Sequence, residues 1–386
     1  MDLGLLAAVA VVALAFLFDF TNGFHDAANS VSTVVATRAL PARWAVWFSA
    51  LFNVLALFVV GTAVASTVAT TVKPGVAGVA VVFSALVAAI SWNYATWWIG
   101  MPSSSSHALI GGLVGAGLAA GGLDAITWGS VEKAAIAIVV SPLIAFGIAF
   151  VAMRAVDALH RRTQLEDHSP VLRWIQLGSA AAVSFGHGAN DAQKTMGVVA
   201  ALLVGTGHLA VGAGGTIDVP FWVEAAAYGS IALGTVWGGW KIIETMGLRI
   251  TRLRPQSAVA ANIGALTAIF GATGVGAPIS TTQAAASSVA GSGLSSGAGV
   301  QLRVLGEMVL AWAVTLPVTV ALAFGVQRLT ELPGAWSAVC VGALVVVLGG
   351  LIGWAMRHSL DADALEAELP AADDDVVVAE PVDAAA

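Results

Sequence analysis

The sequence has few charges, a single cysteine and long stretches with no ionisable group. Asp, Glu, Lys and Arg make up only 10% of the 386 residues, against about 25% in ordinary soluble domains. Residues 44–72, 74–123 and 255–302 contain none of the four. Each run exceeds the roughly 20 apolar residues that cross a bilayer, which excludes a soluble globular protein and predicts a multi-pass membrane protein.

Other absences narrow the class further. The single cysteine, Cys340, excludes an intramolecular disulfide. No glycine-rich loop ends in the lysine of a nucleotide-binding motif, so the 43 glycines indicate close helix packing rather than phosphate loops. The N-terminal apolar run has no basic region ahead of it, which predicts a retained first helix rather than a cleaved signal peptide.

Acidic residues are concentrated at the C-terminal end. Residues 359–386 hold nine acidic residues and no basic one, and without them the net charge of −7 becomes +2. The overall acidity therefore carries no information about a ligand. The segment has no apolar period, and we predict that it is a disordered tail.

The apolar runs predict an all-α fold, a polytopic transmembrane helical bundle with broken helices. The expected membrane segments are 3–36 (long and interrupted), 44–65, 76–98, 103–122, 131–153, 174–204, 220–243, 257–275, 279–298, 304–326 and 335–356. We group them into a first repeat (1–153), a cytoplasmic linker (154–173), a second repeat (174–326) and an additional helix (335–356).

Basic residues predict which loops face the cytoplasm. They cluster at Arg38 and Arg43, in the stretch 154–173, and from Arg249 to Arg254. The positive-inside rule puts these clusters in the cytoplasm and the N-terminus outside. Five segments precede the central stretch, so the second half is predicted to enter the membrane in the opposite orientation, as inverted-topology repeats do.

Three pairs of matching phrases support the repeat. Asp26 lies in Gly23–Ser30 (GFHDAANS), and Asp191 lies 165 positions later in Gly188–Thr195 (GANDAQKT). A proline-hydroxyl stretch occurs twice with a shift of 176, as PSSSSH at 102–107 and PISTTQ at 278–283. The third pair, shifted by 175, is Glu132 with Pro142 and Glu307 with Pro317. Such a duplicated plan is typical of membrane transporters.

The proline-hydroxyl stretches favour binding of an oxyanion. A proline followed by hydroxyl residues between two apolar runs predicts that one helix ends and another starts, with the proline in the first turn of the new helix. The new N-terminus presents free N–H groups and the positive end of the helix dipole. Two such half-helices from antiparallel halves would meet near the bilayer midplane. The hydroxyls predicted to hold a dianion such as hydrogen phosphate are Ser104, Ser105, Ser106, Ser280, Thr281 and Thr282.

The aspartates predict coupling between the anion and a cation. Asp26 and Asp191 would repel an anion if both were ionised and bare, so each must carry a proton or coordinate a cation when the anion is bound. Lys194, three residues after Asp191, adds a positive charge in one half only, which could replace a metal ion or hold the anion. The neighbouring amides that suit a cation through oxygen, or the anion through N–H, are Asn22, Asn29 and Asn190.

Other polar residues in the apolar segments have two interpretations. Asp19 has no counterpart in the second half, where Ser184 stands, and it fits an interfacial helix cap as well as a functional group. Hydroxyls in membrane helices often only join neighbouring helices. Three histidines could be packed and satisfied side chains: His25, His107 and His187.

The sequence resembles the inorganic phosphate transporter (PiT) family, and more closely its bacterial low-affinity members. The resemblance rests on the phrases TNGFHDAAN (21–29) and HGANDAQK (187–194), on the two proline-hydroxyl stretches, and on GGWKIIETMG (238–247). It extends from about residue 5 to residue 355. It implies symport of phosphate with a cation across the bacterial inner membrane, with phosphate held between the two hydroxyl-rich stretches of a scaffold and a moving part.

Departures from the family pattern bear on the coupling ion. Sodium-coupled relatives carry the phrase Gly-Ala-Asn-Asp-x-x-Asn in both halves, whereas this chain has His25 in the first phrase and Lys194 in the second. These departures resemble bacterial members that use protons and carry phosphate as a neutral complex with a divalent metal. Gln283 stands where the family usually has His, which weakens a proton role for that position.

We therefore expect a low-affinity inorganic phosphate symporter coupled to protons, with His25 the better proton acceptor. It would need no cofactor, bind no nucleic acid and lie in the lipid bilayer, where two copies could form a homodimer. A sodium-coupled phosphate permease and a sulfate permease of the same fold remain alternatives. An intramembrane hydrolase, with a Ser among Ser103–Ser106 as nucleophile and a His as base, is an alternative of another class. A passive channel or a sensor is a further alternative.

Overall fold

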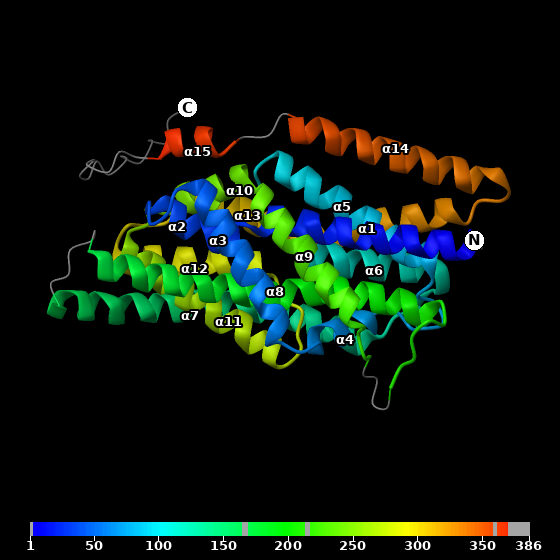
Figure 1. The fold of residues 1–386 in the computed structure, drawn as a ribbon, viewed down its shortest axis with the longest axis horizontal. Coiled ribbons are helices and arrows are strands. Elements are labelled where there is room, and N and C mark those ends of the chain that lie inside the picture. Colours follow the sequence, from blue (N-terminus) through cyan, green and yellow to red (C-terminus); the bar gives the residue numbers. More distant parts are fainter. Residues whose placement is uncertain (1–2, 164–168, 213–216, 358–360, 370–386) are drawn as a thin grey trace.

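The computed structural model describes residues 3–163, 169–212, 217–357 and 361–369, whose regular structure is nearly all helical (Figure 1). The first half contains α1 (Leu3–Asp26), α2 (Ala28–Ala36), α3 (Ala42–Leu55), η1 (Ala56–Phe58), α4 (Ala63–Ala69), α5 (Val79–Trp98), α6 (Ser105–Gly121), η2 (Leu123–Ala125) and α7 (Trp128–Thr163). The second half contains α8 (Pro170–Gly205), α9 (Phe221–Trp237), α10 (Trp240–Glu244), η4 (Thr245–Arg249), α11 (Pro255–Gly274), α12 (Thr281–Ser296), α13 (Leu302–Thr330), α14 (Ala335–Arg357) and α15 (Ala362–Glu368).

Six of the described helices are long and apolar enough to cross a bilayer, or seven if the bent pair α3–α4 forms one span. The sequence predicts eleven segments, and part of the difference lies in α6 and α12, which have only 17 and 16 residues. At 1.5 Å per residue, helices of that length fall short of a hydrocarbon core of roughly 30 Å. The direction in which each half crosses the membrane remains a prediction.

Two segments of the first half are interrupted, and the sequence predicts this for 3–36 but not for 44–65. Helix α1 ends at Asp26, and α2 begins after the single residue Ala27. Helices α3 and α4 meet at an angle of 87°. In the second half α8 continues for 36 residues without interruption through Asp191. The first aspartate phrase thus has a one-residue irregularity at Ala27 that the second lacks, although Ala27 keeps helical backbone angles and residues 4–36 form one candidate span.

The two short helices α6 and α12 lie inside the bundle. Almost every residue of each is buried. Helix α6 packs against α13 and α5, and α12 packs against α7 and α11. Helix α14, by contrast, lies along the outside of the bundle and buries none of its apolar window (Figure 1). The starts of α6 and α12 thus lie away from lipid, where non-helical backbone is tolerated in membrane proteins.

Glycines in the two aspartate phrases allow close helix contact. A methyl group on Gly188 would lie 2.6 Å from the carbonyl oxygen of Asn53 in α3, and one on Gly23 would clash with the backbone of Ile231 in α9. Close approach through small residues is a common means of helix association in membranes. These glycines hold α8 against α3 and α1 against α9, and so fix where Asp191 and Asp26 lie.

The predicted linker, 154–173, is shorter than expected. Helix α7 continues to Thr163 and α8 begins at Pro170, with Ser169 as its N-cap. The basic residues that suggested a loop, Arg161 and Arg162, lie in the last turn of α7, where the helix dipole favours positive charge. Residues 164–168 lie outside the described ranges.

The predicted disordered tail, 359–386, is partly helical, which corrects that expectation for residues 361–369. Helix α15 buries Ala362 and Leu365 and packs against α3 and α10. Glu366 accepts a hydrogen bond of 2.7 Å from the backbone N–H of Ala42 at the start of α3, and Asp363 pairs with Arg43. An acidic helix is therefore matched to a basic surface, a contact that composition alone does not reveal. Residues 358–360 and 370–386 lie outside the described ranges.

We expect Gly188→Ala to destabilise the protein by roughly 1–3 kcal/mol, because overpacking forces α8 away from α3. The measurement is thermal unfolding of the purified protein in detergent. Gly178→Ala in the same helix is the matched control, since a methyl group there meets nothing within 4 Å. Alanine also favours a helix more than glycine does, so this control should not be destabilised. Equal stability of the two variants would contradict the close contact.

Candidate functional site

The hydroxyl-rich stretches form the N-termini of α6 and α12 with the same local geometry. Ser104 is the N-cap of α6, and its Oγ accepts from the N–H of His107 at 3.2 Å. Ser280 is the N-cap of α12, and its Oγ accepts from the N–H of Gln283, also at 3.2 Å. These two hydroxyls, predicted as phosphate ligands, therefore accept backbone hydrogen bonds as helix caps.

The prolines lie outside the helices they introduce. The sequence predicts them in the first turn, but Pro102 and Pro278 each precede the N-cap by two residues. A proline disfavours helical backbone in the residue before it and fixes its own φ. It therefore separates the new helix from the preceding segment, while the first turn itself is occupied by hydroxyl residues.

Asp26 is held by donors from both hydroxyl-rich stretches. Ser105 Oγ donates to its Oδ2 at 2.9 Å, and Thr282 Oγ1 donates to its Oδ1 at 3.0 Å. His25 Nδ1 lies 2.8 Å from Oδ1. The carboxyl group is 1% exposed, so these contacts replace water as its solvation. One carboxylate thus joins the starts of α6 and α12 to the end of α1.

Asp191 is matched mainly by Lys194. The Lys194 ammonium donates to Asp191 Oδ1 at 2.6 Å, and Thr281 Oγ1 donates to Oδ2 at 3.1 Å. Lys194 also donates to Ser106 Oγ and, at 2.9 Å, to the carbonyl of Ile279. The pair is completely buried, and removing one member of such a pair typically costs roughly 3–5 kcal/mol. Lys194 therefore connects the second aspartate to the first hydroxyl-rich stretch.

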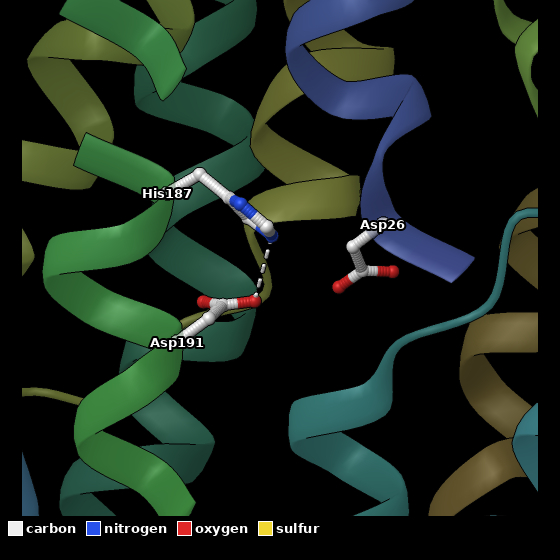
Figure 2. A group of neighbouring side chains, drawn as sticks. All are labelled: Asp26, His187 and Asp191. Atoms are coloured by element: carbon white, nitrogen blue, oxygen red, sulfur yellow. Dashed lines mark ion pairs between the residues drawn. The ribbon is translucent and has the colours of Figure 1, made fainter. Parts of the chain in front are cut away.

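The two aspartates face one another across a small gap. Figure 2 shows their carboxyl groups pointing toward each other from α1 and α8, with His187 beside both. Ligand atoms of Asp26, His187 and Asp191 all lie within 4.8 Å of one another, a spacing that could accommodate a metal ion. His187 Nε2 is 3.4 Å from Asp191 Oδ2. We call these three residues the carboxylate cluster.

The three asparagines do not share one role. Asn29 donates to Thr281 Oγ1 at 3.1 Å and to Thr282 Oγ1 at 3.2 Å. Asn22 donates to Asp191 Oδ2 at 3.5 Å. The amide of Asn190 instead donates to Thr273 Oγ1 and to the carbonyl of Ala277, beside α11. The structure therefore brings Asn22 and Asn29 to the site, whereas the N–H groups of Asn190 bind elsewhere.

His25 connects Asp26 to two hydroxyls. Its Nε2 lies 3.1 Å from Thr96 Oγ1 and 3.3 Å from Ser103 Oγ, while Nδ1 faces Asp26. Ser103, His25 and Asp26 thus stand in the order of a hydrolase triad. Ser103 is fully buried, and Asp26 also accepts from hydroxyls outside such a triad. The arrangement equally allows a proton to enter the pair formed by His25 and Asp26.

Sequence reasoning treated His187 only as a packed histidine, although it belongs to the carboxylate cluster. Its Nδ1 lies 3.3 Å from Asn53 Oδ1, which orients the ring. The signal in the sequence is spacing, because His187 precedes Asp191 by four residues and so lies on the same helical face. The backbone carbonyl of Ile279 was also missed. Nothing in a side-chain pattern indicates that a carbonyl will accept from both Lys194 and Ser106.

Relatives of known name align with most of the chain. It is 45% identical over 311 residues to a protein of Rhizobium meliloti (strain 1021) named "Probable low-affinity inorganic phosphate transporter", covering 80% of this chain and 92% of the relative. A protein of the same name from Bacillus subtilis (strain 168) is 39% identical over 326 residues, covering 83% and 96%.

A solved structure and a family model agree with these relatives. The structure described as "The sodium-dependent phosphate transporter" superposes with a TM-score of 0.76, covering 85% of this chain and 100% of that chain, at 24% sequence identity. That likeness shows the fold of a membrane transporter. The model described as "Phosphate transporter family" matches residues 22–323, which include both aspartate phrases and both hydroxyl-rich stretches. The chain therefore belongs to the phosphate transporter family.

Proposed function

We propose that the protein is a low-affinity inorganic phosphate symporter of the bacterial inner membrane, driven by protons. Its multi-pass helical fold and its bacterial relatives support the membrane setting and the substrate. The starts of α6 and α12 would hold phosphate through hydroxyls and free backbone N–H groups. The residues proposed to contact it are Ser104, Ser105, Ser106, Ser280, Thr281, Thr282 and Lys194.

One observation carries the coupling mechanism. The hydroxyl hydrogens of Ser105 and Thr282 are donated to the Asp26 carboxylate. A hydroxyl has one hydrogen to donate, so it cannot serve a carboxylate and a phosphate oxygen at the same time. A proton on Asp26 weakens both hydrogen bonds and releases two donors for the anion. Phosphate and the proton therefore favour each other's binding, which is what symport requires.

His25 and Lys194 distinguish the two half-sites. His25 lies 2.8 Å from Asp26, and histidine is the side chain that ordinarily titrates nearest neutral pH. We assign proton entry to this pair. Lys194 already supplies a positive charge beside Asp191, so that carboxylate can remain ionised through the cycle. The proposed cation-coupling residues are thus Asp26, His25, Asn29, Asp191, Asn190 and Asn22, and Lys194 is proposed as a phosphate contact.

The carboxylate cluster supports a second form of the cargo, a complex of phosphate with a divalent metal. Two carboxylates and an imidazole are ligands that such metals accept. A metal ion carried with phosphate would offset charge on both the anion and the aspartates. The metal is then transported as substrate, and the phosphate contacts proposed above are unchanged.

In vesicles containing the full chain, we expect phosphate to accumulate when the exterior is made acidic in sodium-free buffer. A sodium gradient at equal pH should drive no accumulation. Uptake driven by sodium alone would overturn the proton assignment. Phosphate that only runs down its own gradient, without uphill accumulation, would indicate a channel. Excess sulfate is the specificity control, because competition by sulfate would instead favour a sulfate permease.

We expect Asp26→Asn to abolish accumulation driven by a pH gradient, since the amide cannot take up a proton. Exchange of internal for external labelled phosphate should continue, because exchange needs no net movement of protons. Asp124→Asn, which changes an exposed carboxylate, is the matched control. Normal accumulation by Asp26→Asn would remove this residue from the coupling mechanism.

Chelation of divalent metals should lower phosphate uptake, and labelled Mn²⁺ should enter only together with phosphate. His187→Gln should reduce Mn²⁺ entry because it removes one group of the carboxylate cluster. His208→Gln, at an exposed histidine, serves as the control. Phosphate uptake that is insensitive to chelation, with no entry of metal, would exclude the metal complex.

A further inference from the structure

A third carboxylate lies inside the membrane bundle, outside the carboxylate cluster. Asp19 is 0% exposed and lies well within α1, seven residues before its end. It is therefore not the interfacial cap that its sequence position allowed. In the described part of the chain no hydrogen bond of normal geometry reaches either of its carboxyl oxygens, although Thr195 and Asn22 lie close enough for weak ones. An unmatched ionised carboxylate at such a site costs several kcal/mol, so it demands a physical explanation.

Oxygen-bearing side chains from three helices surround Asp19. Helix α1 packs against α8 and α9, which also pack against each other. Polar groups that interact with it include Thr195 of α8 and Asn22 of α1, and Tyr228 of α9 is close enough to interact electrostatically. The Thr195 hydroxyl, the Tyr228 hydroxyl and Asn22 Oδ1 are buried, and in the described part of the chain they too have no partner. Four adjacent residues with unmatched oxygens suggest a site for a small positive species.

The charged groups facing Asp19 do not neutralise it. On α8, Asp191 has the same sign of charge, and Lys194 is already bound to Asp191, Ser106 and the Ile279 carbonyl. On α9, Tyr228 is itself influenced by Glu224. On α5 the titratable neighbour is Tyr94. Its ring packs on Phe24, which lies more than one helical turn beyond Asp19 in α1. Within the described ranges, no positive group is therefore paired directly with Asp19, and Lys194 acts on it only from its place beside Asp191.

We propose that Asp19 is a proton-binding site, separate from the phosphate site, that carries one of the coupled protons. The proposal rests on the proton coupling proposed above and extends it by naming a second carrier. A proton needs only one oxygen, whereas a sodium ion needs several oxygens converging on one point. The surrounding hydroxyls and the Asn22 carbonyl supply acceptors and donors for the protonated carboxyl group.

Asn22 connects this site to the carboxylate cluster. Asp19, Asn22 and Asp26 succeed one another along one face of α1 at spacings of three and four residues. Asp19 thus lies about 10 Å along the helix from Asp26, beyond direct contact with the hydroxyl-rich stretches. The amide of Asn22 donates to Asp191 Oδ2 at 3.5 Å, while its Oδ1 is free to accept from a protonated Asp19. Protonation of Asp19 can therefore influence Asp191 through the hydrogen bonds of one amide, that of Asn22.

The first test measures how many protons drive accumulation. With the membrane potential clamped at zero and a gradient of about one pH unit, each coupled proton contributes about tenfold to the final phosphate ratio. We expect Asp19→Asn to lower that ratio by about tenfold while retaining exchange of labelled phosphate, since the phosphate contacts are untouched. Asp124→Asn is again the matched control and should match the unmodified chain.

The outcomes separate this inference from the proposed function. If the unmodified chain accumulates phosphate and Asp19→Asn reaches the same ratio, the Asp19 site is wrong and proton symport stands. If the unmodified chain fails to accumulate phosphate under a pH gradient, both proposals fall. A variant that loses exchange as well as accumulation, although folded, places Asp19 in phosphate binding and also overturns its separate role.

A second measurement uses the unmodified protein and does not depend on folding of a variant. Dicyclohexylcarbodiimide reacts with protonated carboxyl groups: the proton moves to a carbodiimide nitrogen and the carboxylate oxygen adds to the central carbon. We expect mass spectrometry to find the label on Asp19, with less label as pH rises and no effect of sodium. Protection by sodium would identify a sodium site instead. Absence of label at every pH would show that Asp19 is not protonated.

Discussion

Carboxylates that neither water nor lipid headgroups can solvate must obtain hydrogen-bond donors from the protein itself. Asp26 obtains them from Ser105, Thr282 and His25, and Asp191 obtains them from Lys194 and a threonine. Since the hydroxyls stand at the starts of two half-helices, satisfying the acids also determines where α6 and α12 begin. The interior arrangement of the bundle thus follows from the need to solvate two buried charges.

The same hydrogen bonds hold the site together and are central to the proposed coupling. In the proposed cycle, a donor that holds a carboxylate in one state is released for an anion in another, so one set of hydroxyls serves both partners in turn. Lys194 makes the halves unequal, because the second acid has a permanent counter-charge while the first relies on hydroxyls and an imidazole. The two acids lie in similar phrases but have different environments, because His25 occurs only in the first phrase and Lys194 only in the second.

Much of this site could be predicted from residue types and spacing. Paired phrases around Asp26 and Asp191 indicated two acids meeting two hydroxyl-rich stretches, and the structure brings these groups together. Spacing failed where tertiary packing decides direction: the Asn190 amide binds beside α11, and His187 belongs to the cluster. Apolar runs predict most of the helices, but hydropathy does not show where the backbone breaks. The short helices α6 and α12 are therefore predicted as full membrane segments. The cap geometry after Pro102 likewise depends on backbone angles that composition does not specify.

The unequal backbones around the two acids have a mechanical consequence. Helix α8 is a stiff rod of roughly 54 Å, so any displacement of Asp191 moves its whole length. Asp26 lies beside Ala27, where the hydrogen-bond pattern of the helix is interrupted for one residue although the backbone angles stay helical. A small rotation there would alter the distances from Asp26 to Ser105 and Thr282 while leaving the rod in place. The first acid can therefore change its contacts through local bending, whereas the second moves only with its helix.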